Sequence, residues 1–171
     1  TNIGETTMGN RAVITTNKNL EDTGIYIHWN GGRDSVEAFL AYCDLKGFRK
    51  PENDNYGWAC LTRVISNFFA SSIEDGLSIG VDNCKYLDCN NWDNGVYIIK
   101  NWRIVDRMFY TGKEQQEYDF MDMLREIDKS QPVNARLNAE QWARAEEMLE
   151  DIKKYRKTIY KRDEKGRFCK E

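Results

Sequence analysis

The chain has 171 residues, of which 40% are hydrophobic and 31% are charged. This length is enough for one globular domain whose core needs no disulfide bonds for its stability. No apolar stretch approaches the roughly 20 residues of a membrane-spanning helix, and the N-terminus lacks the pattern of a secretory signal. Composition therefore argues against a membrane protein. We expect a cytoplasmic protein whose five cysteines are reduced thiols.

The net charge of −3 is distributed unevenly along the chain. From Lys153 onward there are nine basic and three acidic residues, so residues 1–152 carry a charge of −9. An acidic body disfavours general affinity for nucleic acid, which depends on Lys and Arg, and it suits a basic partner. The simpler explanation for any single acidic run is a solvated helix face.

Strand and helix patterns alternate in the first half of the chain. Residues 25–29 show the period of two that half-buried strands have. Residues 11–16 read as a strand before them, and the two predict a hairpin. Asp34 is expected to cap a helix that ends at Gly47, with Glu37 completing a capping box. Apolar residues at spacings of three and four predict a second helix over residues 56–70.

Three strands and two helices are predicted in the second half. Residues 77–81 alternate, the turn residues 93–95 lead into a strand over 96–99, and 102–109 form a fifth strand. Helices are expected over 116–129 and 139–157, the second capped by Asn138. Mostly hairpin connections predict an α+β fold, an antiparallel sheet of about five strands with helices packed on one face, plus a C-terminal helix.

Four parts are predicted along the chain. Residues 1–7 read as an N-terminal extension, with Met8 a plausible start, and residues 8–130 as the α+β core domain. Residues 131–160 are expected to form the C-terminal helix, and residues 161–171 a basic tail. The boundary near residue 131 is predicted because this segment holds Pro132, one of only two prolines.

The segment over residues 113–128 is the main candidate for a partner-binding surface. Its acids, with aromatic residues between them, suit a positively charged cleft in which they would mimic phosphates. The simpler interpretation is a solvated helix with its apolar side turned inward. The two interpretations are compatible, because packing concerns one face of the helix and partner binding the other. The predicted partner-binding residues are Glu114, Glu117, Asp119, Asp122 and Glu126.

A second candidate is the turn at Gly31, Gly32 and Arg33, between a strand and a helix N-terminus. Exposed backbone N–H groups and the helix dipole could hold a phosphate there, with Arg33 as its partner. The spacing of known nucleotide-binding glycine loops is absent, and Asp34 as the cap would place a carboxylate where the anion should lie. A tight glycine turn without a ligand is the simpler interpretation.

Metal and catalytic chemistry have weaker candidates. Cys84, Cys89 and His28 could supply three zinc ligands, but a fourth is not evident. Carboxylates such as Asp88 and Asp93 sit in turn-rich sequence, where Asp is common without any metal. His28 is the only histidine, and no arrangement around it indicates a nucleophile or a general base. We predict no catalytic residue, no metal and no cofactor.

Four motifs resemble a group of small proteins carried by phages, prophages and conjugative elements of Gram-positive bacteria. They are GNRAVIT at residues 9–15, GIYIHWNGGRDSVEAFLAYC at 24–43, YGWACL at 56–61 and LDCNNWDNGVYII at 87–99. The likeness covers residues 8–112. In its acidity, its size and its lack of catalytic motifs the chain is similar in kind to type II anti-CRISPR proteins.

This resemblance implies a non-enzymatic protein of the host bacterial cytoplasm that binds an RNA-guided Cas nuclease, whose DNA channel is rich in Lys and Arg. The resemblance does not identify any binding residue in this chain, because no motif here matches a mapped interface. The basic C-terminal tail would contact guide RNA or DNA, and the sequence leaves open whether the protein is a homodimer. The alternative function is a sponge that binds a nucleotide-like defence signal at the turn of Gly31 to Arg33.

Overall fold

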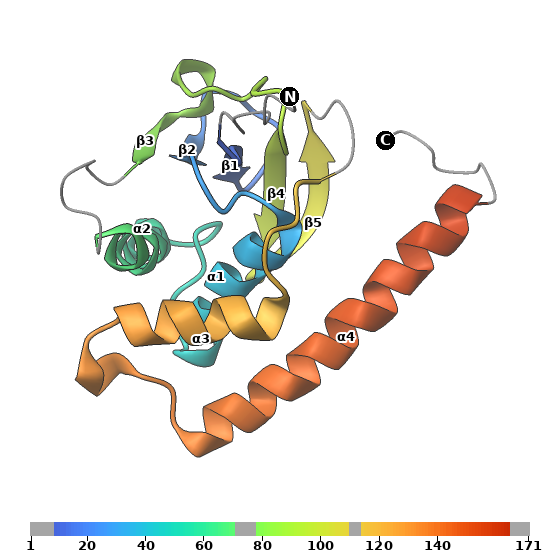
Figure 1. Ribbon diagram of the computed structural model, residues 1–171. Coiled ribbons are helices and arrows are strands. Elements are labelled where there is room, and N and C mark those ends of the chain that lie inside the picture. The colour runs from blue at the N-terminus through green and yellow to red at the C-terminus, as the bar shows by residue number, and fades with distance from the viewer. Residues whose placement is uncertain (1–8, 71–77, 110–113, 165–171) are drawn as a thin grey trace, which may run out of the picture.

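The computed structural model describes residues 9–70, 78–109 and 114–164 (Figure 1). The predicted extension over 1–7, residue 77 of the third predicted strand and residues 165–171 of the basic tail lie outside these described residues. The strands are β1 (Ala12–Thr15), β2 (Thr23–Ile27), β3 (Ile79–Asn83), β4 (Val96–Lys100) and β5 (Arg103–Met108). The α-helices are α1 (Arg33–Leu45), α2 (Asn55–Phe69), α3 (Phe120–Ser130) and α4 (Ala139–Glu164).

The strands form one sheet in the order β3-β2-β1-β4-β5. Three neighbouring pairs are antiparallel, but β1 and β4 are parallel, with Val13 opposite Val96. The α+β class is confirmed, and the expectation of a purely antiparallel sheet is wrong. The physical reason is the connection between β3 and β4. It crosses the sheet instead of closing a hairpin, so β2 and β1 lie between the two strands.

The helices pack on one face of the sheet, as predicted. The main core joins Ile14, Ile25 and Ile99 of the sheet to buried residues of all four α-helices. The other face is covered by the crossing segment, whose Cys84 and Cys89 pack on Val13, Val96 and Ile98. Both faces of β1 and β4 are therefore buried, which explains their nearly continuous apolar sequences.

The N-terminus of α1 differs from the predicted capping box. Gly32 occupies the cap position without a side-chain hydrogen bond, and Asp34 lies in the first turn of the helix. Asp34 and Glu37 both accept hydrogen bonds from Arg156 of α4, so neither carboxylate caps the helix. Contacts between distant segments have here replaced a local cap that the sequence pattern favours.

The predicted cap of α4 at Asn138 is confirmed. Asn138 accepts a hydrogen bond from the Gln141 backbone N–H, and Gln141 Oε1 accepts one from the Asn138 backbone N–H, which is a reciprocal capping box. The apolar spacing of Trp142, Ala145, Leu149 and Ile152 predicts that this side of α4 faces the core. Ala145 and Ile152 are buried there, and Trp142 and Leu149 are partly buried against it. None of the helices in the described part of the chain is long and apolar enough to cross a membrane.

Candidate functional site

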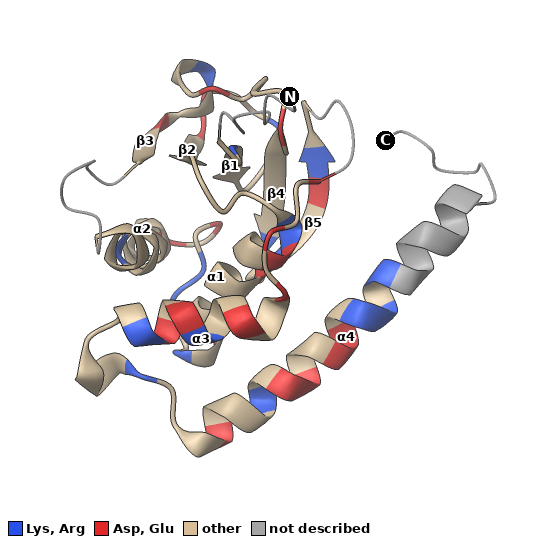
Figure 2. Ribbon diagram, viewed as in Figure 1, with Lys and Arg blue, Asp and Glu red and all other residues tan. Residues whose placement is uncertain are grey.

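The acidic face of α3 is exposed to solvent. Phe120, Met123, Leu124 and Ile127 point into the core, so the polar positions of the helix face outward. Glu117, Asp119, Asp122 and Glu126 are exposed on α3 and in the segment before it (Figure 2). The structure thus brings four of the five predicted partner-binding residues to one side of the molecule.

Three of these four carboxylates already have local contacts. Asp119 caps α3 by accepting a hydrogen bond from the Asp122 backbone N–H at 2.9 Å, and this backbone contact lowers the pKa of Asp119. Asp122 pairs with Arg125 at 2.6 Å and Glu126 with Lys129 at 3.0 Å. All four pair members are more than half exposed, so each pair contributes little to stability and can be exchanged for contacts with a partner.

Glu114 does not join this surface. Its carboxylate is 14% exposed and lies 2.7 Å from Nη2 of Arg33 and 3.5 Å from Nη1 of Arg107. Arg33 Nε also donates to both carboxylate oxygens. Because Glu114 is committed to two largely buried arginines, we assign it to the internal ion-pair network and not to the exposed acidic face.

The first half of α4 carries a second group of exposed acidic residues, which the sequence analysis missed. Residues 139–152 hold five acidic residues and one arginine. α4 packs against α3 and α1, and Figure 2 shows red acidic positions along the first half of α4. A charge count over the helix alone would have found this signal. We define the acidic surface as Glu117, Asp119, Asp122, Glu126, Glu140, Glu146, Glu147 and Glu150, all of them exposed.

The candidate anion site at Gly31, Gly32 and Arg33 is covered by the chain itself. Arg33 is held by Glu114, and the Asp34 backbone N–H donates to Oε1 of Gln116 at 3.0 Å. The carboxylate and amide of the 114–116 segment therefore stand where a bound phosphate would be. A nucleotide-like ligand would have to displace Glu114 from Arg33 before it could bind.

An internal ion-pair network surrounds this turn. Besides Arg33, Arg107 and Glu114, it includes Glu37 and Arg156, which lie 2.6 Å apart. The two guanidinium groups of Arg33 and Arg107 each lie 5.7 Å from the ring centre of Tyr97, which is fully buried. Burial raises the pKa of Tyr97 well above its ordinary value, so its hydroxyl stays protonated. The network ties α1, β4, β5, α4 and the 114–116 segment together.

We predict that Gly32→Ala destabilises the protein by about 1 to 3 kcal/mol. A Cβ at Gly32 would lie 2.4 Å from the backbone oxygen of Gln115, although its φ of −64° suits any residue. The cost is mainly steric, with a smaller contribution from placing Ala at the helix cap, where Gly is preferred. Gly80→Ala is the control, because its Cβ would meet no atom closer than 3.8 Å. Thermal unfolding of both variants tests this, and equal midpoints would show that the 114–116 segment does not press on the turn.

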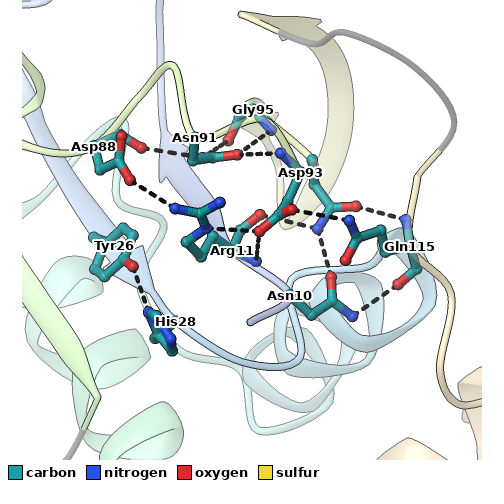
Figure 3. Close-up of polar contacts among 10 residues, drawn as sticks. Asn10, Arg11, Tyr26, His28, Asp88, Asn91, Asp93, Gly95 and Gln115 are labelled. Atoms are coloured by element: carbon teal, nitrogen blue, oxygen red, sulfur yellow. Dashed lines mark hydrogen bonds and ion pairs between the residues drawn. The ribbon is translucent and has the colours of Figure 1, made fainter. Parts of the chain in front are cut away.

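A second polar cluster links the start of β1 to the crossing segment (Figure 3). Arg11 Nε lies 2.7 Å from Asp93, and Arg11 Nη1 lies 3.5 Å from Asp88. Asn10 and Gln115 complete the cluster through hydrogen bonds that close around Asp93 and its neighbours. The predicted carboxylate pair thus faces a guanidinium group, which takes the place that a metal cation would occupy.

The remaining candidates are also engaged in packing. Nδ1 of His28 lies 2.7 Å from the hydroxyl of Tyr26. Cys89 Sγ donates to the backbone oxygen of Cys84, and burial raises the pKa of the Cys89 thiol to about 11. In the described part of the chain, no group of three or more His, Cys, Asp or Glu residues could hold a metal ion. His28 and the two thiols therefore contribute to packing in this arrangement.

No protein-family model matches the chain, and searches of curated proteins and of solved structures found no significant match. The structure therefore establishes two properties: an α+β fold with a mixed sheet, and an exposed acidic surface.

Proposed function

We propose that this protein is a non-enzymatic inhibitor that binds an RNA-guided Cas nuclease of the bacterial host and blocks DNA targeting. The observation that supports it is the acidic surface on α3 and the first half of α4 (Figure 2). The sequence resemblance to anti-CRISPR proteins supplies the class of partner, and the surface supplies a means of binding it.

The chemistry of such a complex is electrostatic. A Cas nuclease holds its nucleic acids in a positively charged channel, so a surface of closely spaced carboxylates competes with phosphates for the same Lys and Arg side chains. Tyr118, which is 46% exposed beside Glu117 and Asp119, adds an aromatic contact of the kind that anchors protein interfaces. The acids of α3 are held on a helix whose opposite face is buried, so their spacing is set before binding.

The C-terminal half of α4 changes sign. Lys153 and Lys154 are exposed just after Glu150 and Asp151, where the helix becomes mainly basic and could contact guide RNA or DNA. Arg156 differs from its basic neighbours, because its guanidinium group binds Asp34 and Glu37 of α1. The proposed nucleic-acid contact therefore excludes Arg156.

We predict that the double variant Asp122→Lys, Glu126→Lys raises the half-inhibitory concentration by about tenfold or more, because it replaces two carboxylates of the acidic surface with cations. The measurement is DNA cleavage by a guide-loaded type II Cas nuclease titrated with each variant, together with co-elution on size exclusion. Inhibition by the native chain should also weaken as salt is raised, since exposed charges are screened.

The matched control is Glu21→Lys, Asp106→Lys. It makes the same change in net charge and also breaks two exposed ion pairs, Glu21 with Lys85 and Asp106 with Lys18. We expect this control to inhibit like the native chain. If both double variants inhibit equally well, the acidic surface is not the interface. If the native chain neither inhibits nor co-elutes with any of several such nucleases, the proposed function is wrong.

A further inference from the structure

A pocket of about 290 Å³ lies between α1, β5 and α4. Its apolar lining includes Trp102, Ile104, Met148 and Ile152, each at most 8% exposed. No residue of the acidic surface lines it. The volume is near the lower end of the range for pockets that hold small molecules. It is large enough for a compact ligand with a ring or a short aliphatic chain.

The polar lining of this pocket is mainly anionic. Glu37 and Asp44 reach it from α1, Asp151 from α4 and Arg103 from β5. Glu37 is neutralised by Arg156. Asp44 and Asp151 form no ion pair or side-chain hydrogen bond with any residue that the structure describes. With Arg103 as the one remaining cation among the described lining residues, these two aspartates leave an excess negative charge beside an apolar floor.

The carboxylates and the apolar residues of the pocket lining together indicate which kind of ligand fits. Asp151 is exposed and Asp44 is partly buried, so water solvates both carboxylates when the pocket is empty. They would repel an anion, and a neutral apolar molecule would gain nothing from them. A cationic group placed at Asp44 and Asp151 would form charge-assisted hydrogen bonds, while an attached apolar body displaces water from Ile104 and Met148. The pocket therefore suits a molecule that has both parts.

We propose that this pocket binds a small organic cation, an ammonium or guanidinium group carried on an apolar body. The inference does not depend on the proposed inhibitor function, because it uses a different part of the molecule. The ligand would contact three elements at once, so its binding would also hold α4 against α1 and β5.

The first experiment compares three probes of one shape on the full-length protein: phenethylamine, phenethyl alcohol and 3-phenylpropanoate. Binding is followed by ¹H–¹⁵N NMR at the indole N–H of Trp102, which lines the pocket and donates to the Phe48 backbone oxygen. We expect the amine to shift this signal with a Kd of about 1 mM or lower, a modest demand for a ligand of this size. The alcohol and the carboxylate should bind about tenfold more weakly or not at all.

Two matched pairs of variants locate the site. Asp44→Asn, Asp151→Asn should weaken the amine about tenfold and leave the alcohol unchanged, whereas Glu147→Gln, Glu150→Gln, which removes two acids outside the pocket, should change neither. Val105→Trp should block every probe, because Val105 lines the pocket and is 47% exposed. Its control is Val81→Trp, a similarly exposed valine on the opposite edge strand.

Three results would overturn the proposal. One is the absence of any shift at Trp102 with amine at about 10 mM, well above the expected Kd. Another is binding of the carboxylate as tightly as the amine. The third is undiminished binding of the amine to Val105→Trp. Since both valines are half exposed on edge strands, loss of folding is not expected to confuse the comparison.

Discussion

We expect Glu114→Gln to lower the free energy of unfolding by about 3 to 5 kcal/mol, because it leaves two buried cations without their shared anion. The side chain of Arg33 is 13% exposed and that of Arg107 is 4% exposed. Burial alone would lower the pKa of Arg33, but the hydrogen bonds and charge of Glu114 raise it above its ordinary value. Glu114 therefore offsets the cost of burying the Arg33 charge.

Urea denaturation followed by circular dichroism measures this loss. Glu117→Gln is the control, since Glu117 is exposed three residues further along the same segment and its change should stay within about 0.5 kcal/mol. A double-mutant cycle with Arg33→Met and Glu114→Met separates pairing from burial. The free energy of unfolding lost in the double variant should be smaller than the sum of the losses in the two single variants. Equal stability of Glu114→Gln and the native chain would contradict this account.

Arg156→Met is the second large effect, with an expected loss of about 2 to 3 kcal/mol at neutral pH. The Arg156 guanidinium lies 2.6 Å from Glu37 and also binds Asp34, and its side chain is 25% exposed, which moderates the loss. Among the described residues, the variant leaves Glu37, at 9% exposure, with the more distant Arg33, 4.0 Å away, as its paired cation. The measurement is again urea denaturation, performed across a range of pH.

The loss should depend on pH in a defined direction. Burial raises the pKa of Glu37, and the two arginines offset this only in part. Removing Arg156 raises this pKa further, so the folded variant takes up a proton at a pH where the unfolded chain does not. Its destabilisation relative to the native chain should therefore be largest at pH 7 to 8 and shrink as the pH falls toward about 4.

Lys153→Met provides the comparison for Arg156. Lys153 is an exposed basic residue on the same helix, and it pairs with Glu150 on the surface. Its replacement should cost less than about 0.5 kcal/mol, with little pH dependence. A pH-independent loss in Arg156→Met would show that the residue acts through packing of its methylene groups instead of its charge.

Local sequence patterns were sufficient for most elements of this fold. The alternation in β2 and the apolar spacing in α2 and α4 depend on neighbours within a few residues, and these elements appear where they were predicted. The pairing of β1 with β4 was not predictable in this way. Its partners are more than 80 residues apart, and the turn residues 93–95 favour a hairpin just as strongly as a crossover.

The candidate site shows the same limit. Glu117, Asp119, Asp122 and Glu126 are exposed, as the helical period indicated, because their positions depend on one helix. Glu114 and Arg33 looked like surface ligands, but they bind each other across 81 residues. Asp34 and Glu37 matched a capping box, yet they are drawn to Arg156, 122 and 119 residues away. Contacts between residues this far apart in the sequence leave no periodic pattern from which they could be predicted.

The parallel pairing of β1 with β4 also affects the order in which a new chain can fold. As synthesis proceeds from the N-terminus, β1 and β2 are complete well before residues 96–100 emerge, since β2 ends at Ile27. Until then the edge of β1 that β4 will cover stays open, and every residue of that strand is one that the finished protein buries. A nascent chain with such an edge is prone to pairing with other strands, so this protein is expected to need rapid completion or chaperone protection during synthesis.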